Sequence, residues 1–141
     1  MTLEDLTCKI ACGDLIVAFA NAIDYSRYDE VAALFTGDGE VARGDEVSRG
    51  PEAILATLQR RPADRITRHM VSNIRISRTS PDTAEGLSYV HLYRTTGQAE
   101  DFPLPLPAPA ACAEWRDRFV LTDEGWRIAR REIVIILGTA P

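Results

Sequence analysis

The hydrophobic pattern of this chain changes its period near Thr67, and that change limits the folds the chain can adopt. Before this point apolar residues recur at helical spacing, and after it they alternate with polar residues at every second position. Helices that precede a run of alternating strands are typical of an α+β domain with an antiparallel sheet. At 141 residues the chain has the length of one domain, so we expect residues 1–141 to fold as a single unit.

Three helices are expected in the first half of the chain. Residues 3–23 should form the longest, because one face carries a continuous apolar stripe made of Leu3, Leu6, Ile10, Gly13, Val17 and Ala20. Asp24 takes the next position on that stripe, where its carboxylate should be buried. A short helix near Ser26 and a third helix opened by Gly50-Pro51 follow, with a weak strand or hairpin over residues 40–47 between them.

Four antiparallel strands are expected in the second half, at residues 67–80, 83–95, 114–121 and 125–137. The segment 97–111 separates the second strand from the third and contains four prolines. Proline cannot donate a hydrogen bond within a sheet, so we expect an extended loop there.

Charge and cysteine content narrow the class of protein. A net charge of −5 argues against a surface that binds nucleic acid. Cys8, Cys12 and Cys112 are odd in number and lack a CxxC spacing, which favours free thiols in a reducing compartment. No basic segment precedes an apolar run at the N-terminus, and the stretch 133–137 is too short to cross a bilayer. We therefore expect a cytoplasmic protein that binds neither nucleic acid nor membrane.

Asp24 and His69 are the residues that point most clearly to chemistry. A buried carboxylate is costly without a partner, and a histidine at hydrogen-bond distance would supply one. The carboxylate would hold the imidazole in one tautomer and make its other nitrogen a better proton acceptor. Such a histidine can act as a general base toward a carbon next to a carbonyl or a leaving group. Alternatively, Asp24 caps the second helix or pairs with Arg27 at the surface, and His69 is a satisfied core residue.

Three further residues are candidates for substrate binding. Tyr28 lies on the buried face of the second helix and could offer its hydroxyl to a ligand. Asn73 has the same strand parity as His69, so we expect it to face the same way. His91 shares one face of the next strand with Tyr89 and Tyr93, and that face could line a pocket or form a subunit contact.

Other chemistries lack their sequence signatures. The two histidines lie far apart without a Glu-x-x-His or CxxC frame, so no metal site is expected. No Gly-x-Gly-x-x-Gly or phosphate loop occurs, so no nucleotide cofactor is expected. No Gly-x-Ser-x-Gly marks a catalytic serine. We expect a protein that works without a cofactor.

Four local patterns occur in a recognisable order: Asp24 followed by Tyr28-Asp29 and Leu34-Phe35, then residues 49–54, residues 68–73 and residues 125–128. Together they resemble the nuclear transport factor 2-like superfamily, specifically its polyketide-cyclase-like (SnoaL-like) branch, over roughly residues 5–137. The resemblance implies a cystatin-like fold, in which a cone-shaped, curved antiparallel sheet wraps around N-terminal helices and encloses an apolar pocket. It also implies a homodimer formed through the outer sheet face.

At the site the chain resembles scytalone dehydratase and hexachlorocyclohexane dehydrochlorinase. Both place an aspartate just after the first helix and a histidine at the start of a long strand, as Asp24 and His69 stand here. The dehydrochlorinase also has the spacing between His69 and Asn73. The resemblance implies that His69 is the base, that Asp24 orients it, and that Tyr28, Asn73 and His91 place the substrate.

The implied function is that of a cofactor-independent lyase or isomerase acting on a small apolar molecule, cyclic or polyketide-like. Two alternatives remain, because members of one superfamily can differ widely in function. One is a non-catalytic domain that binds a small hydrophobic ligand in the same pocket. The other is an assembly subunit that resembles the small subunit of ring-hydroxylating dioxygenases.

Overall fold

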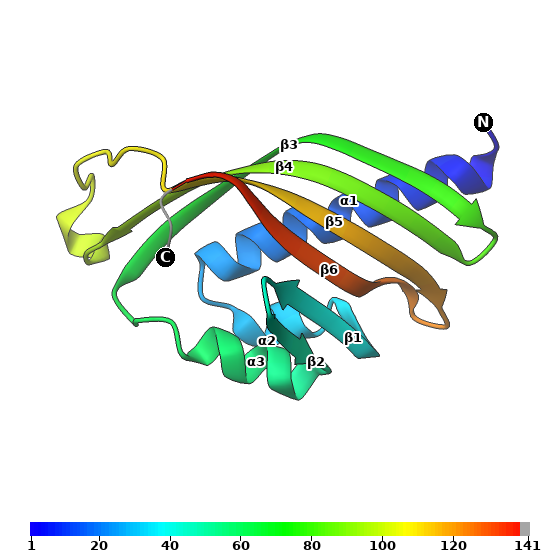
Figure 1. Cartoon of the computed structure of the whole chain (residues 1–141), viewed down its shortest axis with the longest axis horizontal. Coiled ribbons are helices and arrows are strands. Elements are labelled where there is room, and N and C mark those ends of the chain that lie inside the picture. The colour runs from blue at the N-terminus through cyan, green and yellow to red at the C-terminus, as the bar shows by residue number, and fades with distance from the viewer. Residues whose placement is uncertain (139–141) are drawn as a thin grey trace.

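Three α-helices and a six-stranded sheet make up residues 1–138, the part of the chain that the computed structural model describes (Figure 1). The helices are α1 (Leu3–Asp24), α2 (Tyr28–Ala32) and α3 (Pro51–Gln59). The strands are β1 (Phe35–Arg43), β2 (Glu46–Arg49), β3 (Arg65–Ser80), β4 (Thr83–Thr96), β5 (Ala111–Thr122) and β6 (Gly125–Gly138). The proline-rich segment between β4 and β5 is a loop with one short 3₁₀ turn (Ala99–Asp101). The predicted α+β class is confirmed.

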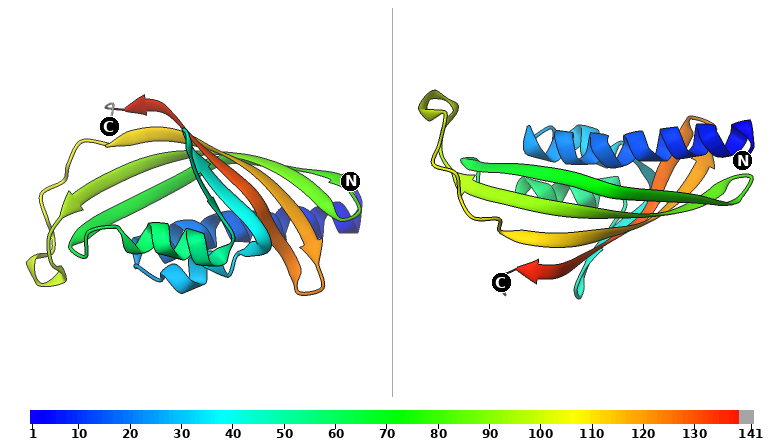
Figure 2. Two further views of the ribbon diagram at one scale, coloured as in Figure 1. Left: turned by 60° about the horizontal axis from the view of Figure 1, so that its bottom comes forward. Right: turned by 90° about the horizontal axis from the view of Figure 1, so that it is seen from above.

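The strands form one curved, open sheet in the order β2-β1-β6-β5-β4-β3. Strands β3 to β6 make the predicted antiparallel meander. The predicted weak hairpin is β1 and β2, and β1 extends the sheet by pairing in parallel with β6. The long strands arch over the helices, which lie on the concave side of the sheet (Figure 2). This is the architecture that the resemblance implied.

Helix α1 buries a different face from the one predicted. Its buried side chains include Cys8, Cys12, Leu15, Ile16, Phe19 and Ile23. The predicted stripe mostly faces outward, with Leu3 74% exposed and Ile10 66% exposed. Apolar residues occur on all sides of this helix, so helical periodicity could not identify the buried face.

The same helix bears on the expectation that the protein binds no membrane, which stays a prediction. Its length and apolar composition would allow α1 to cross a bilayer, whereas the sequence analysis considered only the short stretch at residues 133–137. Core helices of soluble proteins meet the same criterion, and α1 contacts β3 and β6. Helix α1 is therefore only weak evidence for a membrane segment.

A fully buried ion pair, which the sequence analysis did not anticipate, lies in the core. Arg131 on β6 stands opposite Asp117 on β5, and both side chains are 0% exposed. Two parallel hydrogen bonds of 2.7 Å join Nε to Oδ1 and Nη2 to Oδ2. The guanidinium carbon also lies 4.2 Å from the ring centroid of Phe19 and 4.0 Å from that of Trp115. The pair thereby contacts α1 through the ring of Phe19, while Trp115 belongs to β5 of the sheet.

Removing one member of this pair should be costly. We expect Asp117→Ala to lower the free energy of unfolding by about 3–5 kcal/mol, because Arg131 would keep a buried charge without its partner. Urea denaturation followed by circular dichroism measures the change. Arg118→Gln, at an exposed position of the same strand, is the control and should change stability by less than about 0.5 kcal/mol. Equal effects of the two substitutions would contradict a stabilising role for the pair.

Candidate active site

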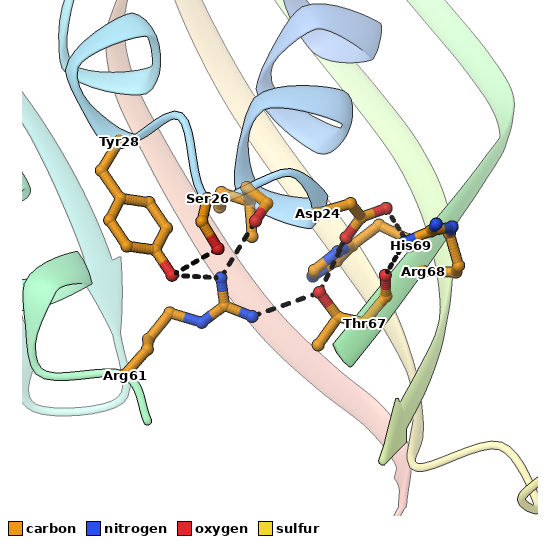
Figure 3. Close-up of polar contacts among 8 residues, drawn as sticks. Asp24, Ser26, Tyr28, Arg61, Thr67, Arg68 and His69 are labelled. Atoms are coloured by element: carbon orange, nitrogen blue, oxygen red, sulfur yellow. Dashed lines mark hydrogen bonds and ion pairs between the residues drawn. The ribbon is translucent and has the colours of Figure 1, made fainter. Parts of the chain in front are cut away.

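Asp24 and His69 are in direct contact (Figure 3). Oδ1 of Asp24 lies 2.6 Å from Nδ1 of His69, and Oδ2 accepts a hydrogen bond of 2.9 Å from the backbone N–H of His69. The side chains of Asp24 and His69 are 5% and 14% exposed. Arg27 pairs with Glu30 instead, so the alternative of a surface pair between Asp24 and Arg27 is wrong. The contact joins the last residue of α1 to the first half of β3.

The hydrogen bonds at Asp24 decide its charge. Burial, the largest single effect, would raise the pKa of the carboxyl group. The hydrogen bonds from the ring and backbone of His69, with a further one of 2.9 Å from the Thr67 hydroxyl, together outweigh burial and hold the pKa below 3.8. Asp24 is therefore ionised at neutral pH.

The charge of Asp24 in turn determines the tautomer of His69. An ionised carboxylate can only accept hydrogen bonds, so Nδ1 of His69 carries the proton in this contact. In the neutral imidazole the other nitrogen, Nε2, is then a proton acceptor. This is the arrangement that a histidine base requires.

His69 lines a cavity of about 520 Å³ between the sheet and the helices. Much of its wall is apolar and comes from both layers, including Phe19, Ile23, Val31, Ile54, Val90 and Trp115. The ring of Trp115 lies 5.9 Å from that of His69, centroid to centroid. Asp24 is not part of the wall, so the carboxylate stands behind the histidine as seen from the cavity.

Thr67 and Arg61 belong to the site, although neither role was predicted from the sequence. The Thr67 hydroxyl donates to Asp24 and accepts a hydrogen bond of 3.2 Å from Nη2 of Arg61. Nη1 of Arg61 donates to the carbonyl oxygen of Ile23 at 3.2 Å. Thr67 shares strand parity with His69, and that parity was the signal that could have identified it. Nothing local in the sequence indicates that Arg61 reaches the end of α1.

Tyr28 lies beside the cavity and is not one of the residues that line it. Its hydroxyl accepts a hydrogen bond of 3.2 Å from Nη1 of Arg61 and lies 3.4 Å from Oγ of Ser26 (Figure 3). The contact with Arg61 therefore connects Tyr28 to the site without exposing it to the cavity.

The prediction that Asn73 faces the same way as His69 is wrong. Asn73 has a φ of 52°, and the pairing of β3 with β4 changes register between Ser72 and Arg75. A bulge of this kind breaks the alternation of side chains along a strand. Asn73 is exposed and lies outside the cavity wall.

His91 does not reach the cavity either. The inward positions of β4 include Ser88 and Val90, which are buried, whereas Tyr89 and His91 are exposed on the opposite face. Successive residues of a strand point to opposite sides, so His91 cannot turn inward while Val90 is buried. The structure brings together Asp24 and His69, places Tyr28 nearby, and leaves Asn73 and His91 outside.

Metal ligands and reactive thiols are not evident in the described part of the chain. Residues 1–138 contain no group of three or more histidine, cysteine, aspartate or glutamate side chains placed to hold a metal ion. Cys8, Cys12 and Cys112 are free thiols. Burial raises the pKa of both Cys8 and Cys12, which keeps them in the unreactive protonated form.

The backbone at Asn73 generates one prediction. We expect Asn73→Val to lower the free energy of unfolding by about 1–2 kcal/mol, because a β-branched residue is strained at positive φ. Asn73→Gly should change it by less than about 0.5 kcal/mol, since glycine adopts this conformation freely. Denaturation of both variants and of the neighbouring control Ser72→Val measures the difference. Equal losses for Asn73→Val and Asn73→Gly would show that the backbone conformation is not the reason.

The lowered pKa of Asp24 generates a second prediction, about stability and pH. A carboxyl group whose pKa is lower in the folded state stabilises the fold above its unfolded pKa, near 3.8, and loses that effect as the pH falls through its folded value. The difference in unfolding free energy between wild type and Asp24→Asn should therefore be largest near pH 7 and shrink below about pH 4. Urea titrations at several pH values measure it, with Asp14→Asn on the exposed side of α1 as the control. A difference that stays constant down to about pH 2 would contradict the assignment.

Solved structures that share this fold over nearly the whole chain include the following three proteins. A protein provisionally named scytalone dehydratase from Novosphingobium aromaticivorans is 24% identical, with a TM-score of 0.80 over 97% of this chain and 89% of that protein. An NTF2-like protein with a cystatin-like fold from the same organism is 23% identical, with a TM-score of 0.78 over 96% and 86% of the two chains. LinA, a hexachlorocyclohexane dehydrochlorinase, is 21% identical, with a TM-score of 0.79 over 99% and 97%. At these identities the likeness shows the fold alone.

The sequence itself identifies the family. No curated protein is significantly similar to this chain. The profile of the SnoaL-like domain, however, matches residues 4–132, which is most of the chain. This chain belongs to the SnoaL-like domain family.

Proposed function

We propose that this protein is a cofactor-independent lyase or isomerase that removes a proton from a small, apolar, cyclic or polyketide-like molecule. His69 is the general base and Asp24 orients it. The observation that carries the proposal is the 2.6 Å contact between Asp24 and Nδ1 of a histidine that lines the cavity. A carboxylate on one ring nitrogen and an open cavity beside the ring are what proton abstraction from a bound molecule needs.

The reaction begins when Nε2 of His69 takes a proton from a carbon next to a carbonyl or a leaving group. In an elimination, the electron pair of the C–H bond forms a double bond and the leaving group departs with its own electrons. In an isomerisation, the pair forms a carbon–carbon double bond while the π electrons of the carbonyl move onto its oxygen; the imidazolium then returns the proton at another carbon of the enolate as the carbonyl re-forms. Asp24 stays ionised and stabilises the imidazolium through the Nδ1–H bond. Base catalysis of this kind contributes about 10²–10⁴-fold to the rate.

Two further observations support the proposal. The apolar wall, with Phe19 and Trp115 among its residues, suits a flat hydrocarbon body. Two of the proteins with the same fold carry names that denote eliminations, a dehydratase and a dehydrochlorinase.

Hydrogen–deuterium exchange tests the proposed chemistry without knowledge of the natural substrate. A bicyclic ketone, 1-tetralone, is incubated with the protein in D₂O, and loss of its α-proton signal is followed by NMR. Wild type should accelerate the exchange, and His69→Ala should reduce the acceleration by about 10²-fold or more, because the base is gone. His91→Ala removes the other histidine, on the outer face, and should exchange at the wild-type rate.

Thermal unfolding of both histidine variants shows whether they are folded. Exchange that persists in folded His69→Ala would rule out His69 as the base. Binding of 1-tetralone to wild type without any exchange would favour a non-catalytic ligand-binding domain instead.

A further inference from the structure

The cavity has a strongly basic side. The charged residues that line it are Arg43, Arg60, Arg61, Arg65, Arg94 and Glu46. We call the five arginines the arginine rim. A purely apolar substrate would gain nothing from five guanidinium groups in the wall of its binding site.

The arginine rim is assembled from separate parts of the chain. Arg43 ends β1, Arg60 and Arg61 follow α3, Arg65 begins β3, and Arg94 lies near the end of β4. In the sheet Arg65 pairs with Thr96, and Arg94 pairs with Thr67. Arg65 and Arg94 are therefore diagonal neighbours on the cavity face of two adjacent strands. Like charges placed close together on one face of a sheet destabilise it unless something offsets them.

Protein groups offset only part of this charge. Arg60 forms an ion pair with Glu46. Arg61 donates hydrogen bonds to the neutral oxygens of Ile23, Tyr28 and Thr67. Its connection to Asp24 runs through the Thr67 hydroxyl, which donates to that carboxylate. Within residues 1–138, Arg43, Arg65 and Arg94 make no ion pair with a carboxylate.

The effect of this crowding is visible at Arg65. Burial, followed by the nearby charges of Arg94, Arg61 and Arg43, lowers the pKa of the Arg65 guanidinium from its ordinary value. An anion in this part of the cavity would offset the repulsion between the Arg65 guanidinium and those neighbouring charges.

We propose that the arginine rim binds an anionic oxygen group, a carboxylate or a phosphate, on a substrate whose apolar ring portion extends to His69. Guanidinium groups bind both anions through paired hydrogen bonds. The inference rests on the proposed function in one respect, because it takes this cavity as the substrate site.

The spacing along β3 sets the size of such a substrate. Thr67, opposite Arg94, lies two residues from His69, and Arg65 lies four residues from it. At about 3.3 Å per residue these separations are about 7 and about 13 Å. A fused two-ring aromatic acid has the length to place its anion at the rim and a ring carbon near His69.

Binding of matched naphthalene derivatives tests the inference. The probes are 2-naphthoate and 2-naphthyl phosphate, which are anions, and 2-naphthamide, which is neutral and similar in shape to the naphthoate. Isothermal titration calorimetry at low salt should show that wild type binds at least one anion about tenfold or more tightly than the amide, because one charge-assisted contact contributes that much. The preferred anion distinguishes a carboxylate from a phosphate ligand.

Substitutions then test whether the arginine rim causes the tighter binding of the anion. Arg65→Gln combined with Arg94→Gln should bring the affinity of the anion down to that of the amide. Arg118→Gln, exposed on β5, removes one positive charge elsewhere and should keep the preference. The double variant should melt no earlier than wild type, since it removes like-charge repulsion. His69→Ala should also keep the preference, because the anion does not depend on the base.

The outcomes of this experiment test the inference independently of the proposed proton abstraction. Equal affinity of wild type for the amide and both anions, or binding of none of the probes, would overturn the inference, whatever the exchange experiment shows. An anion preference that survives in the Arg65→Gln and Arg94→Gln double variant would overturn it as well. A preference that depends on the rim would support it even if wild type catalysed no exchange, and only the proposed proton abstraction would then fail.

Discussion

The buried Asp24 carboxylate holds the end of α1 against β3, and the candidate site depends on that attachment. Its two oxygens accept hydrogen bonds from the ring and backbone of His69 and from the Thr67 hydroxyl. An uncompensated carboxylate at this depth would cost several kcal/mol, so the helix end and the strand are constrained to stay together. The same contacts orient the imidazole and select its tautomer. One set of atoms therefore serves both the packing of helix on sheet and the proposed chemistry.

Charge is distributed unevenly around the cavity. The carboxylate lies behind His69, out of the wall, while Arg43, Arg65 and Arg94 are in the wall without a carboxylate partner among residues 1–138. A ligand would therefore meet a basic imidazole and positively charged guanidinium groups within one largely apolar enclosure. Arg65 is half-buried and attracts an anion more strongly than a fully solvated guanidinium would, whereas Arg43 and Arg94 are exposed at the edge of the cavity. Under the proposed function, this combination would separate a position for the anion from a position for the reacting carbon.

The sequence predicted the fold better than it predicted the site. The period of two after Thr67 identified the four long strands, and the resemblance paired Asp24 with His69. The burial of Asp24 was inferred from a stripe through Leu3 and Ile10, and most of that stripe faces outward. The side chain of Asn73 was predicted to face the wrong way because alternation assumes an unbroken strand, and Asn73 lies within a bulge between Ser72 and Arg75. The first error arises because α1 is apolar on all sides, and the second because a bulge interrupts the alternation of side chains.

By itself the sequence determined where helices and strands form, because hydrophobic period, proline and turn residues act over a few positions. It also determined that one acid and one histidine would stand at the junction of helix and strand, through motifs with a recognisable order. Only the tertiary structure decided which side of α1 is buried, that His91 faces outward, and that Asp117 meets Arg131. The arginine rim likewise exists only in the folded chain. Contacts of this kind join segments far apart in sequence, and the register of the sheet, not the local pattern, brings them together.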